Sequence, residues 1–236
     1  MAAFLAARDT TARELMDDPA CDRRVLERTY RRFPAVNAVV SGQRAGYRRW
    51  IRPRARPGAA LRVLDVGTGG GDLPRRLLRW AARDGIAMRV LGIDPDERAI
   101  AYARGRPAPG LEVRATTTTA LRESGERFDV VLSNHVLHHL DDAQVTALLA
   151  DSVALLAPGG IAVHADIARS RFAYLAFAAV TWPLQAGPLR DTFIRPDGLT
   201  SIRRSRTAAE AAALAPIGWR VRRGFPSRLE LVREAP

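Results

Sequence analysis

Short runs of apolar, mostly β-branched residues alternate with amphipathic segments of helical period along the middle of the chain. The apolar runs predict strands at Arg62–Val66, Met88–Ile93, Leu111–Ala115, Phe128–Ser133 and Ile161–Ile167. The segments between them predict helices at Leu73–Arg83, Glu97–Arg104 and Gln144–Leu156, with Gly85 and Pro158–Gly160 ending the first and the last. Because strands that alternate with helices form βαβ units, the pattern predicts a mostly parallel sheet covered on both faces.

The regions on either side of this stretch follow a different pattern. Residues 1–58 predict helices that form a lid segment before the main domain at 59–236, with the linker at 53–58. Residues 168–204 are rich in aromatic side chains and prolines, and predict a helix and a loop inserted over the strand ends to cap the substrate. Thr207 and Glu210 have the spacing of a capping box that starts another helix. Two last strands are predicted at Trp219–Phe225 and Arg228–Val232.

Composition limits the class of protein. The chain has 236 residues, of which 47% are hydrophobic, and this suits one α/β domain with additions. Its single cysteine, Cys21, allows no internal disulfide, and the N-terminus lacks the pattern of a signal peptide, so a cytoplasmic protein is expected. The longest apolar stretch, Phe172–Leu184, is shorter than the ~20 residues that cross a bilayer.

The formal net charge of +12 raises the question of a nucleic-acid partner. All 37 basic residues are arginine, a bias typical of a GC-rich genome, and they are spread along the whole chain. A nucleic-acid binder would instead gather its basic residues on one face. We therefore expect no nucleic-acid partner.

The stretch VLDVGTGGGDLP, residues 63–74, joins the first predicted strand to the first predicted helix. Gly67, Gly69 and Gly71 permit a sharp turn and let a ligand touch the backbone. The G-x-G-x-x-G spacing of dinucleotide-binding loops is absent, and the carboxylates of Asp65 and Asp72 are unfavourable neighbours for a diphosphate. The loop therefore favours a cationic ligand, with a tight turn that binds nothing as the alternative.

A second acidic residue, Asp94, ends the second predicted strand, 94 − 65 = 29 residues after Asp65. An acid at this strand end can accept hydrogen bonds from both hydroxyls of a ribose. Together the two strand ends suit a nucleoside that carries a positive charge, the form of S-adenosylmethionine. Asp94 could instead cap the helix at 97–104, and both roles are compatible.

Four motifs together resemble those of the class I S-adenosylmethionine-dependent methyltransferases, in that family's order over residues 60–167. They are VLDVGTGGGDLP, LGIDPDERAIAYAR, FDVVLSNHVLHHLDD and LLAPGGIAV. The segment NAVVSG at 37–42 and the GGGDL end of the loop are also similar to the ubiquinone/menaquinone-biosynthesis methyltransferases. The resemblance implies a Rossmann-like three-layer sandwich with a mostly parallel seven-stranded sheet and an antiparallel last strand. It also implies S-adenosyl-L-methionine as the cofactor.

The resemblance further implies the residues that would bind this cofactor. Asp65 and the backbone of Gly67 and Gly69 would lie near the amino-acid tail, and Thr68 and Gly71 would shape the loop. Asp94 would hold the ribose, and Pro95 would flank the adenine. Asn134 and His135 would line the methionine side. Thr116 and Thr117 stand where the family often has an acid that meets the adenine amino group, so the adenine contact departs from the family pattern.

Three of the four histidines lie in the segment Asn134–Leu140. If this segment is a helix, His135 faces His138 and His139, which are three and four residues further along the chain. One interpretation makes His135 or His138 a general base that removes a proton from the acceptor. A second is a metal site, although no metal is expected. A third is structural, with His139 as its first member, although His139 is also a candidate to line the acceptor.

The remaining candidates concern the acceptor. They are Tyr30, Phe33, Asp166, Phe172, Phe177, Trp182 and Arg195. Arg203 and Arg204 are further candidates to meet an acidic acceptor, with solvated side chains as the alternative. An apolar, aromatic-lined pocket suits a flat or lipid-like molecule, with simple helix packing as the alternative.

The expected function is O-methylation of a phenol, quinol or polyketide-like hydroxyl in secondary metabolism. C-methylation of a quinone precursor is the first alternative, and a homodimer is possible. A nucleic-acid base methylase would carry an Asn/Asp-Pro-Pro-aromatic motif where this chain has SNHV at 133–136. A nicotinamide oxidoreductase is disfavoured because its glycine fingerprint is missing.

Overall fold

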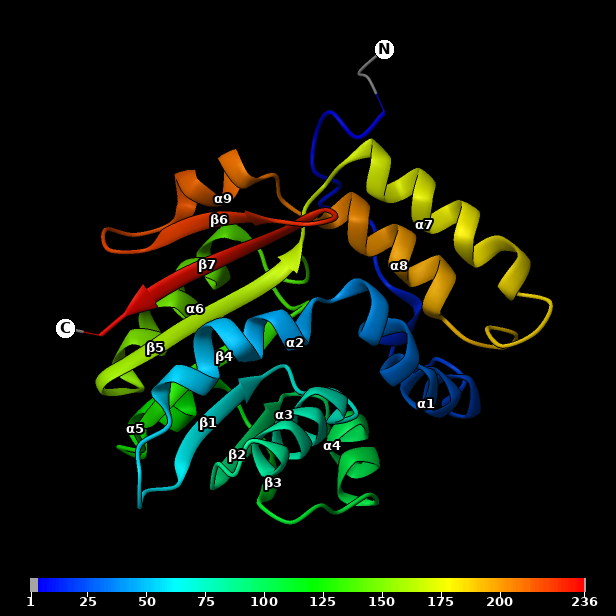
Figure 1. Ribbon diagram of the computed structural model, residues 1–236. Helices are drawn as coiled ribbons and strands as arrows, with labels where there is room; N and C mark the ends of the chain where they lie inside the picture. The colour runs from blue at the N-terminus through cyan, green and yellow to red at the C-terminus, as the bar shows by residue number, and fades with distance from the viewer. Residues whose placement is uncertain (1–3, 236) are drawn as a thin grey trace.

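The computed structural model describes residues 4–235, which form a seven-stranded sheet with helices on both faces (Figure 1). The strands are β1 (Leu61–Val66), β2 (Met88–Asp94), β3 (Leu111–Ala115), β4 (Phe128–Asn134), β5 (Leu156–Ile167), β6 (Arg220–Gly224) and β7 (Arg228–Glu234). Their order is β3-β2-β1-β4-β5-β7-β6; the first five pair in parallel, and β7 runs antiparallel to both of its neighbours. The predicted fold class is confirmed.

The first helical element is a 3-10 turn, η1 (Leu15–Asp17). The others are α1 (Arg23–Val40), α2 (Gln43–Gly46), η2 (Tyr47–Ile51), η3 (Arg52–Arg54), α3 (Asp72–Arg83), α4 (Glu97–Arg104), α5 (Thr118–Glu123), α6 (Asp142–Ala154), α7 (Arg171–Leu184), α8 (Ile194–Arg204) and α9 (Ala208–Leu214). The predicted capping box is present at the start of α9, where Thr207 accepts a hydrogen bond from the backbone N–H of Glu210.

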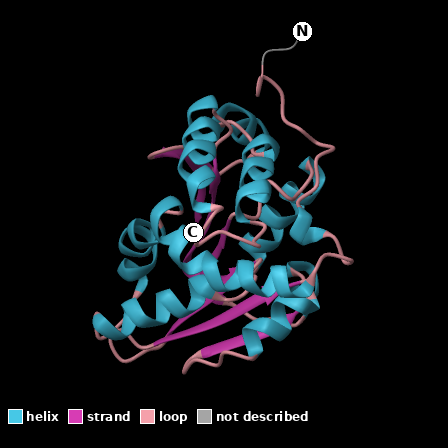
Figure 2. Ribbon diagram, turned by 90° about the vertical axis from the view of Figure 1, so that its right-hand side faces the viewer, coloured by secondary structure: helices cyan, strands magenta, loops and turns pink. Residues whose placement is uncertain are grey.

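Two apolar clusters fix the three layers, which the turned view shows from the side (Figure 2). On one face, Trp50 of η2 and Leu77 of α3 pack against strand residues such as Val63. On the other face, Leu149 of α6 packs against strand residues such as Leu64. Because adjacent residues of β1 enter opposite clusters, both faces of this strand are buried, which explains its continuously apolar sequence.

The structure differs from the predicted elements at two places after β4. Pro158–Gly160 does not end a helix: α6 stops at Ala154, and these residues belong to an irregular start of β5 that shifts the register against β4. The 168–204 insertion contains two helices, α7 and α8, rather than one helix and a loop. Gly198 lies inside α8, where an added Cβ would come 2.4 Å from the ring of Phe177, so its lack of a side chain lets the two helices meet.

The N-terminal segment runs along the carboxyl ends of the parallel strands, between α8 and the sheet domain (Figure 1). Arg98 of α4 donates hydrogen bonds to the backbone oxygens of Met16 and Asp18. Asn37 of α1 donates to the carboxylate of Asp72, the first residue of α3. The N-terminal lid was predicted for residues 1–58, of which 1–3 lie outside the described part. Among the described helices, none has the length and apolar character needed to cross a membrane.

Candidate functional site

The glycine loop makes a tight turn at the carboxyl end of β1. Gly67, Gly69 and Gly71 all have positive φ angles, between 52° and 75°, which a side chain would strain. At Gly67 an added Cβ would lie 2.4 Å from the side chain of Val136, whereas at Gly69 it would meet nothing within 4 Å. Gly67 therefore packs against the segment after β4, while the backbone at Gly69 borders open space where a ligand can approach.

Two carboxylates flank this loop, one buried at Asp65 and one half-buried at Asp94. Asp65 is 2% exposed and accepts a hydrogen bond of 2.8 Å from the hydroxyl of Thr68. Asp94 accepts hydrogen bonds of 2.9 Å from the backbone N–H groups of Gly69 and Asp96. Within residues 4–235, neither carboxylate has an arginine or histidine nitrogen within 4.0 Å, although the chain carries 37 arginines.

The pKa values of both carboxyl groups are raised, as expected for carboxylates that have no cation beside them. Burial, together with the nearby charges of Asp72 and Asp94, raises the pKa of Asp65 to about 8, although the hydrogen bond from Thr68 acts to lower it. Burial likewise raises the pKa of Asp94, against the effect of its backbone donors. Buried carboxylates are normally paired with a cation. The site therefore suits a ligand that brings positive charge to Asp65 and hydroxyl donors to Asp94.

Helix α1 covers the glycine loop. The Cβ atom of Tyr30 and the ring of Tyr102 would both lie 3.2 Å from a Cβ added at Gly70. The rings of Tyr30 and Phe33 are 6.1 Å apart, and both belong to α1. The predicted acceptor residues Tyr30 and Phe33 therefore lie on the glycine-loop side of the site.

The residues predicted beside the adenine lie at the ends of β2 and β3. Pro95 is exposed directly after Asp94, and the backbone N–H of Thr116 donates to the backbone oxygen of Asp94 at 3.2 Å. The side chain of Thr117 caps α5. Contact of these three residues with an adenine stays a prediction.

The histidine segment is a turn and not a helix, which corrects the predicted spacing of its side chains. Asn134 ends β4, and His135 follows with a φ of 61°, in the left-handed region that residues other than glycine rarely adopt. Such a conformation is held by its surroundings and is found often at functional sites.

Three arginines hold this turn by donating to its backbone oxygens. Arg8 donates to His138 and Leu140, at 3.2 and 2.7 Å. Arg204 donates to His138 and His139, at 3.1 Å each, and Arg206 donates to Leu137 and Leu140, at 2.7 and 2.9 Å. Arg204 therefore supports the turn and Arg203 pairs with Asp9, while contact of either residue with an acidic acceptor stays a prediction.

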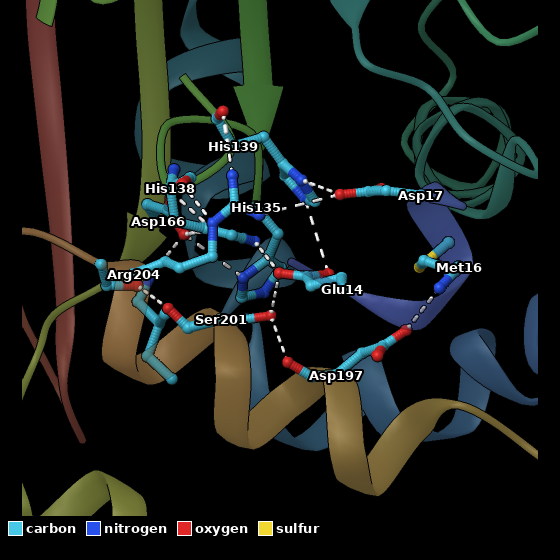
Figure 3. A network of polar contacts seen from close by, with 12 residues as sticks. Glu14, Met16, Asp17, His135, His138, His139, Asp166, Asp197, Ser201 and Arg204 are labelled. Carbon is cyan, nitrogen blue, oxygen red and sulfur yellow. Dashed lines mark hydrogen bonds and ion pairs between the residues drawn. The ribbon is translucent and has the colours of Figure 1, made fainter. Parts of the chain in front are cut away.

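His138 lies buried between two carboxylates (Figure 3). Its Nδ1 atom is 2.9 Å from Oδ1 of Asp166, at the end of β5, and its Nε2 atom is 3.2 Å from Oε1 of Glu14. Burial alone would lower the pKa of His138, but the charges and hydrogen bonds of Asp166 and Glu14 raise it to about 10. At neutral pH this imidazolium has no free lone pair, so His138 cannot accept a proton from an acceptor.

His135 has a different environment. Its Nδ1 atom lies 3.6 Å from Oδ1 of Asp166, and its Nε2 atom is buried and lacks a hydrogen-bond partner in the described part of the chain. A carboxylate on one ring nitrogen and a free second nitrogen are the arrangement of a histidine base. Of the two histidines proposed as the base, only His135 has a nitrogen available.

His139 faces the N-terminal segment. Its Nδ1 atom is 3.1 Å from Asp17, and its Nε2 atom is 3.7 Å from Glu14. Glu14, His138 and His139 each offer one atom within 4.8 Å of the others, a spacing that could hold a metal ion. Both nitrogens of His138 are already bonded to carboxylates, however, so this set of donors fits an imidazolium bridge better than a metal.

The acceptor candidates of the insertion do not gather in one place. Phe172 and Trp182 lie on the exposed side of α7, with exposed fractions of 65% and 72%. Phe177 packs against Gly198 of α8. Arg195 is half-buried, and its Nε atom lacks a partner among the described residues. The acceptor role of these four residues stays a prediction.

Several residues that shape the site were missed from the sequence. Glu14, Arg8 and Arg206 all contact the histidine turn, but they lie 66 or more positions away along the chain. His164, the fourth histidine, is fully buried between Ser133 and Ser152, and burial lowers its pKa to about 3. No motif marks these residues, because their roles depend on long-range packing.

Comparison with known proteins agrees with this geometry. Residues 63–160 match a family described as "Methyltransferase domain". The chain is 35% identical to a ubiquinone biosynthesis O-methyltransferase from Ruegeria pomeroyi over 178 residues, which cover 72% of this chain and 65% of that protein. It is 36% identical to the protein of the same name from Rhizobium rhizogenes over 120 residues, 49% of this chain and 45% of that protein. The chain thus spans about half to two thirds of the length of these relatives.

Solved structures show the same fold. The plantazolicin methyltransferase BpumL, in complex with SAH, has a TM-score of 0.64 at 14% identity, over 94% of this chain and 93% of that one. Human N-acetylserotonin methyltransferase, in complex with SAM, has a TM-score of 0.61 at 12% identity, over 91% of this chain and 56% of that one. Both comparisons cover more of the chain than the family match at 63–160 does.

Proposed function

Because the chain carries the domain of the class I S-adenosylmethionine-dependent methyltransferases, we propose that it transfers a methyl group from S-adenosylmethionine to an oxygen of a small hydrophobic acceptor. The observation that carries this proposal is a pair of carboxylates, buried at Asp65 and half-buried at Asp94, on either side of a glycine loop with no cation beside them in residues 4–235. When bound, the cofactor supplies a methyl group on a positively charged sulfur.

The residues present fit this cofactor. Asp65 is placed to attract the ammonium group of the amino-acid tail, which would supply the missing positive charge. Asp94 is placed to accept hydrogen bonds from the ribose hydroxyls, while the N–H of Gly69 holds its carboxylate in position. Asp65 would gain a cationic partner only when the ligand binds, and this favours the charged nucleoside over a neutral one.

His135 is the proposed general base. Its free Nε2 atom would take the proton of the acceptor hydroxyl, and Asp166 would orient the ring through Nδ1 and stabilise the positive charge that forms. Asp166 also accepts a 2.8 Å hydrogen bond from the backbone N–H of His138, so its own position is fixed. A base that removes the proton of a hydroxyl fits methyl transfer to that oxygen.

The acceptor class is proposed from the relatives. These relatives are named ubiquinone biosynthesis O-methyltransferases, so a phenol or quinol is the first class of acceptor to test. A nucleic acid is disfavoured because many arginines are engaged within the protein, as at Arg8, Arg204 and Arg206. A homodimer stays a prediction, which light scattering after size-exclusion chromatography would test.

The proposed function is tested by binding and by turnover. Isothermal titration calorimetry should show that the protein binds S-adenosylhomocysteine, and that Asp94→Ala weakens this binding tenfold or more, about 1.4 kcal/mol. Exposed Asp191, in the loop between α7 and α8, gives a matched control in Asp191→Ala. A panel of catechols with isotope-labelled S-adenosylmethionine, read by NMR, should give O-methyl products. Absence of binding by folded wild-type protein would refute the proposal.

A further inference from the structure

Arg228, the first residue of β7, is a buried arginine with weak contacts. It is 7% exposed, and among the described residues its guanidinium donates only to Oδ1 of Asn134 and the backbone oxygen of Val40, each at 3.4 Å. Within residues 4–235, no carboxylate oxygen lies within 4.0 Å of its side-chain nitrogens. A buried guanidinium normally has a carboxylate or several short hydrogen bonds.

Gly42 and Gln43, at the start of α2, form part of the surroundings of Arg228. An added Cβ at Gly42 would lie 3.3 Å from its Nε atom, so a glycine with a φ of 57° leaves room for the guanidinium across the start of α2. The next residue, Gln43, is 8% exposed, and both its amide oxygen and its amide nitrogen lack partners among the described residues. A buried polar group without a partner therefore comes directly after the glycine that Arg228 packs against, and such groups are rare in native proteins.

This position adjoins the methionine side of the cofactor site. Asn134 ends β4, which pairs with β1 through Ser133 and Val66, immediately before Gly67. Asn134 was also the residue expected to line that side. A ligand with an α-amino acid tail brings both an ammonium group and a carboxylate. Asp65 can take the ammonium group, and the carboxylate then needs a cation.

We propose that Arg228, together with Gln43, forms a carboxylate-binding subsite at the junction of β4, β7 and α2. The inference rests on the proposed function and names the part of the ligand that this junction takes. Two sources can supply the carboxylate: the amino-acid tail of the cofactor, or an acidic substituent of the acceptor. A guanidinium can bind a carboxylate through two parallel N–H donors, and the amide nitrogen of Gln43 is a further donor.

The first arm of the test compares two nucleosides that differ in the tail. S-adenosylhomocysteine carries the α-amino acid group, and 5′-methylthioadenosine lacks it. Calorimetry should show that Arg228→Met weakens the binding of S-adenosylhomocysteine at least tenfold and changes that of 5′-methylthioadenosine less than twofold. Arg228→Lys, which keeps the charge, should recover part of the loss. Arg223→Met, on an exposed residue of the same hairpin, should change neither affinity.

The second arm compares 3,4-dihydroxybenzoate with catechol, as ligands of the S-adenosylhomocysteine complex. A loss in Arg228→Met that is confined to the benzoate assigns the subsite to the acceptor, and a loss confined to S-adenosylhomocysteine assigns it to the cofactor. If neither pair shows a selective loss, Arg228 has only a packing role and the inference is overturned. If wild-type protein binds neither nucleoside, the proposed function itself fails, so the two failures are distinguishable.

Discussion

Asp166 contacts His138 through both of its carboxylate oxygens, at 2.9 and 3.1 Å from Nδ1, and both side chains are buried. The same carboxylate lies 3.6 Å from His135. One acid at the end of β5 thus serves two histidines, of which one is fixed as an imidazolium and the other keeps a free nitrogen. Glu14 completes the bridge from the N-terminal segment.

The first prediction concerns the pH dependence of stability. In the unfolded chain His138 has a pKa near 6.5, and in the folded protein its pKa is about 10. Its contribution is therefore fully present below about pH 6.5 and is lost as the pH rises through 10. We expect His138→Gln to lower the free energy of unfolding by about 3 kcal/mol at pH 6, and by much less at pH 10. Urea unfolding at several pH values measures this, and a difference that is constant with pH would contradict it.

The second prediction separates the two histidines by function. His135→Gln removes the proposed base and should lower kcat by about 10² or more, while the affinity for S-adenosylhomocysteine stays within twofold. The free energy of unfolding should change little, because Nε2 of His135 lacks a partner in the described chain. Full activity of His135→Gln, measured with an acceptor that the wild type methylates, would exclude His135 as the base.

The sheet and the glycine loop could be predicted from the sequence because their signals are local. The alternation of strands and helices and the glycine spacing at 67, 69 and 71 lie within a few residues of the structures they specify. Asp94 is the last residue of β2, so its position at the sheet edge could be predicted from that strand alone. Its cap role was not confirmed, since Asp96 caps α4.

The histidine turn could not be predicted in the same way. Its apolar and polar spacing resembles a helix, but Arg8, Arg204 and Arg206 satisfy the carbonyl groups that helical hydrogen bonds would otherwise use. Phe177 is a similar case, because its neighbour Gly198 belongs to a helix, whereas Pro196 and Gly198 had suggested a loop. In both cases, tertiary contacts determine whether the segment forms a helix, and the local sequence does not show these contacts.

The third prediction concerns metal ions. A metal ligand must be a neutral imidazole, whereas His138 donates from both ring nitrogens to Asp166 and Glu14. We expect methyl transfer to be unchanged after dialysis against a chelator, and His139→Ala to keep most of its activity with or without added Mg²⁺ or Zn²⁺. Activity that is lost on chelation and restored by either ion would show that a metal displaces the protons of His138.

The last prediction follows from the cost of burying Asp65 without a cation. Burial raises its folded pKa to about 8, above the ordinary value of 3.8, so the folded protein holds a proton that the unfolded chain releases between these pH values. Stability of the unliganded protein should therefore fall as the pH rises from about 4 to 8. Asp65→Asn removes this penalty and should raise the free energy of unfolding at pH 8 by about 1–3 kcal/mol.

The same change should weaken the binding of S-adenosylmethionine tenfold or more, because the ammonium group loses its carboxylate. It should also remove the increase in wild-type affinity expected between pH 6 and 9, where Asp65 ionises. Thermal unfolding and calorimetry on the same samples measure both effects, with Asp129→Asn as the control, because this carboxylate accepts a hydrogen bond from the N–H of Arg62 at the opposite end of β1. A variant that is less stable and binds with unchanged affinity would show that Asp65 has a structural role only.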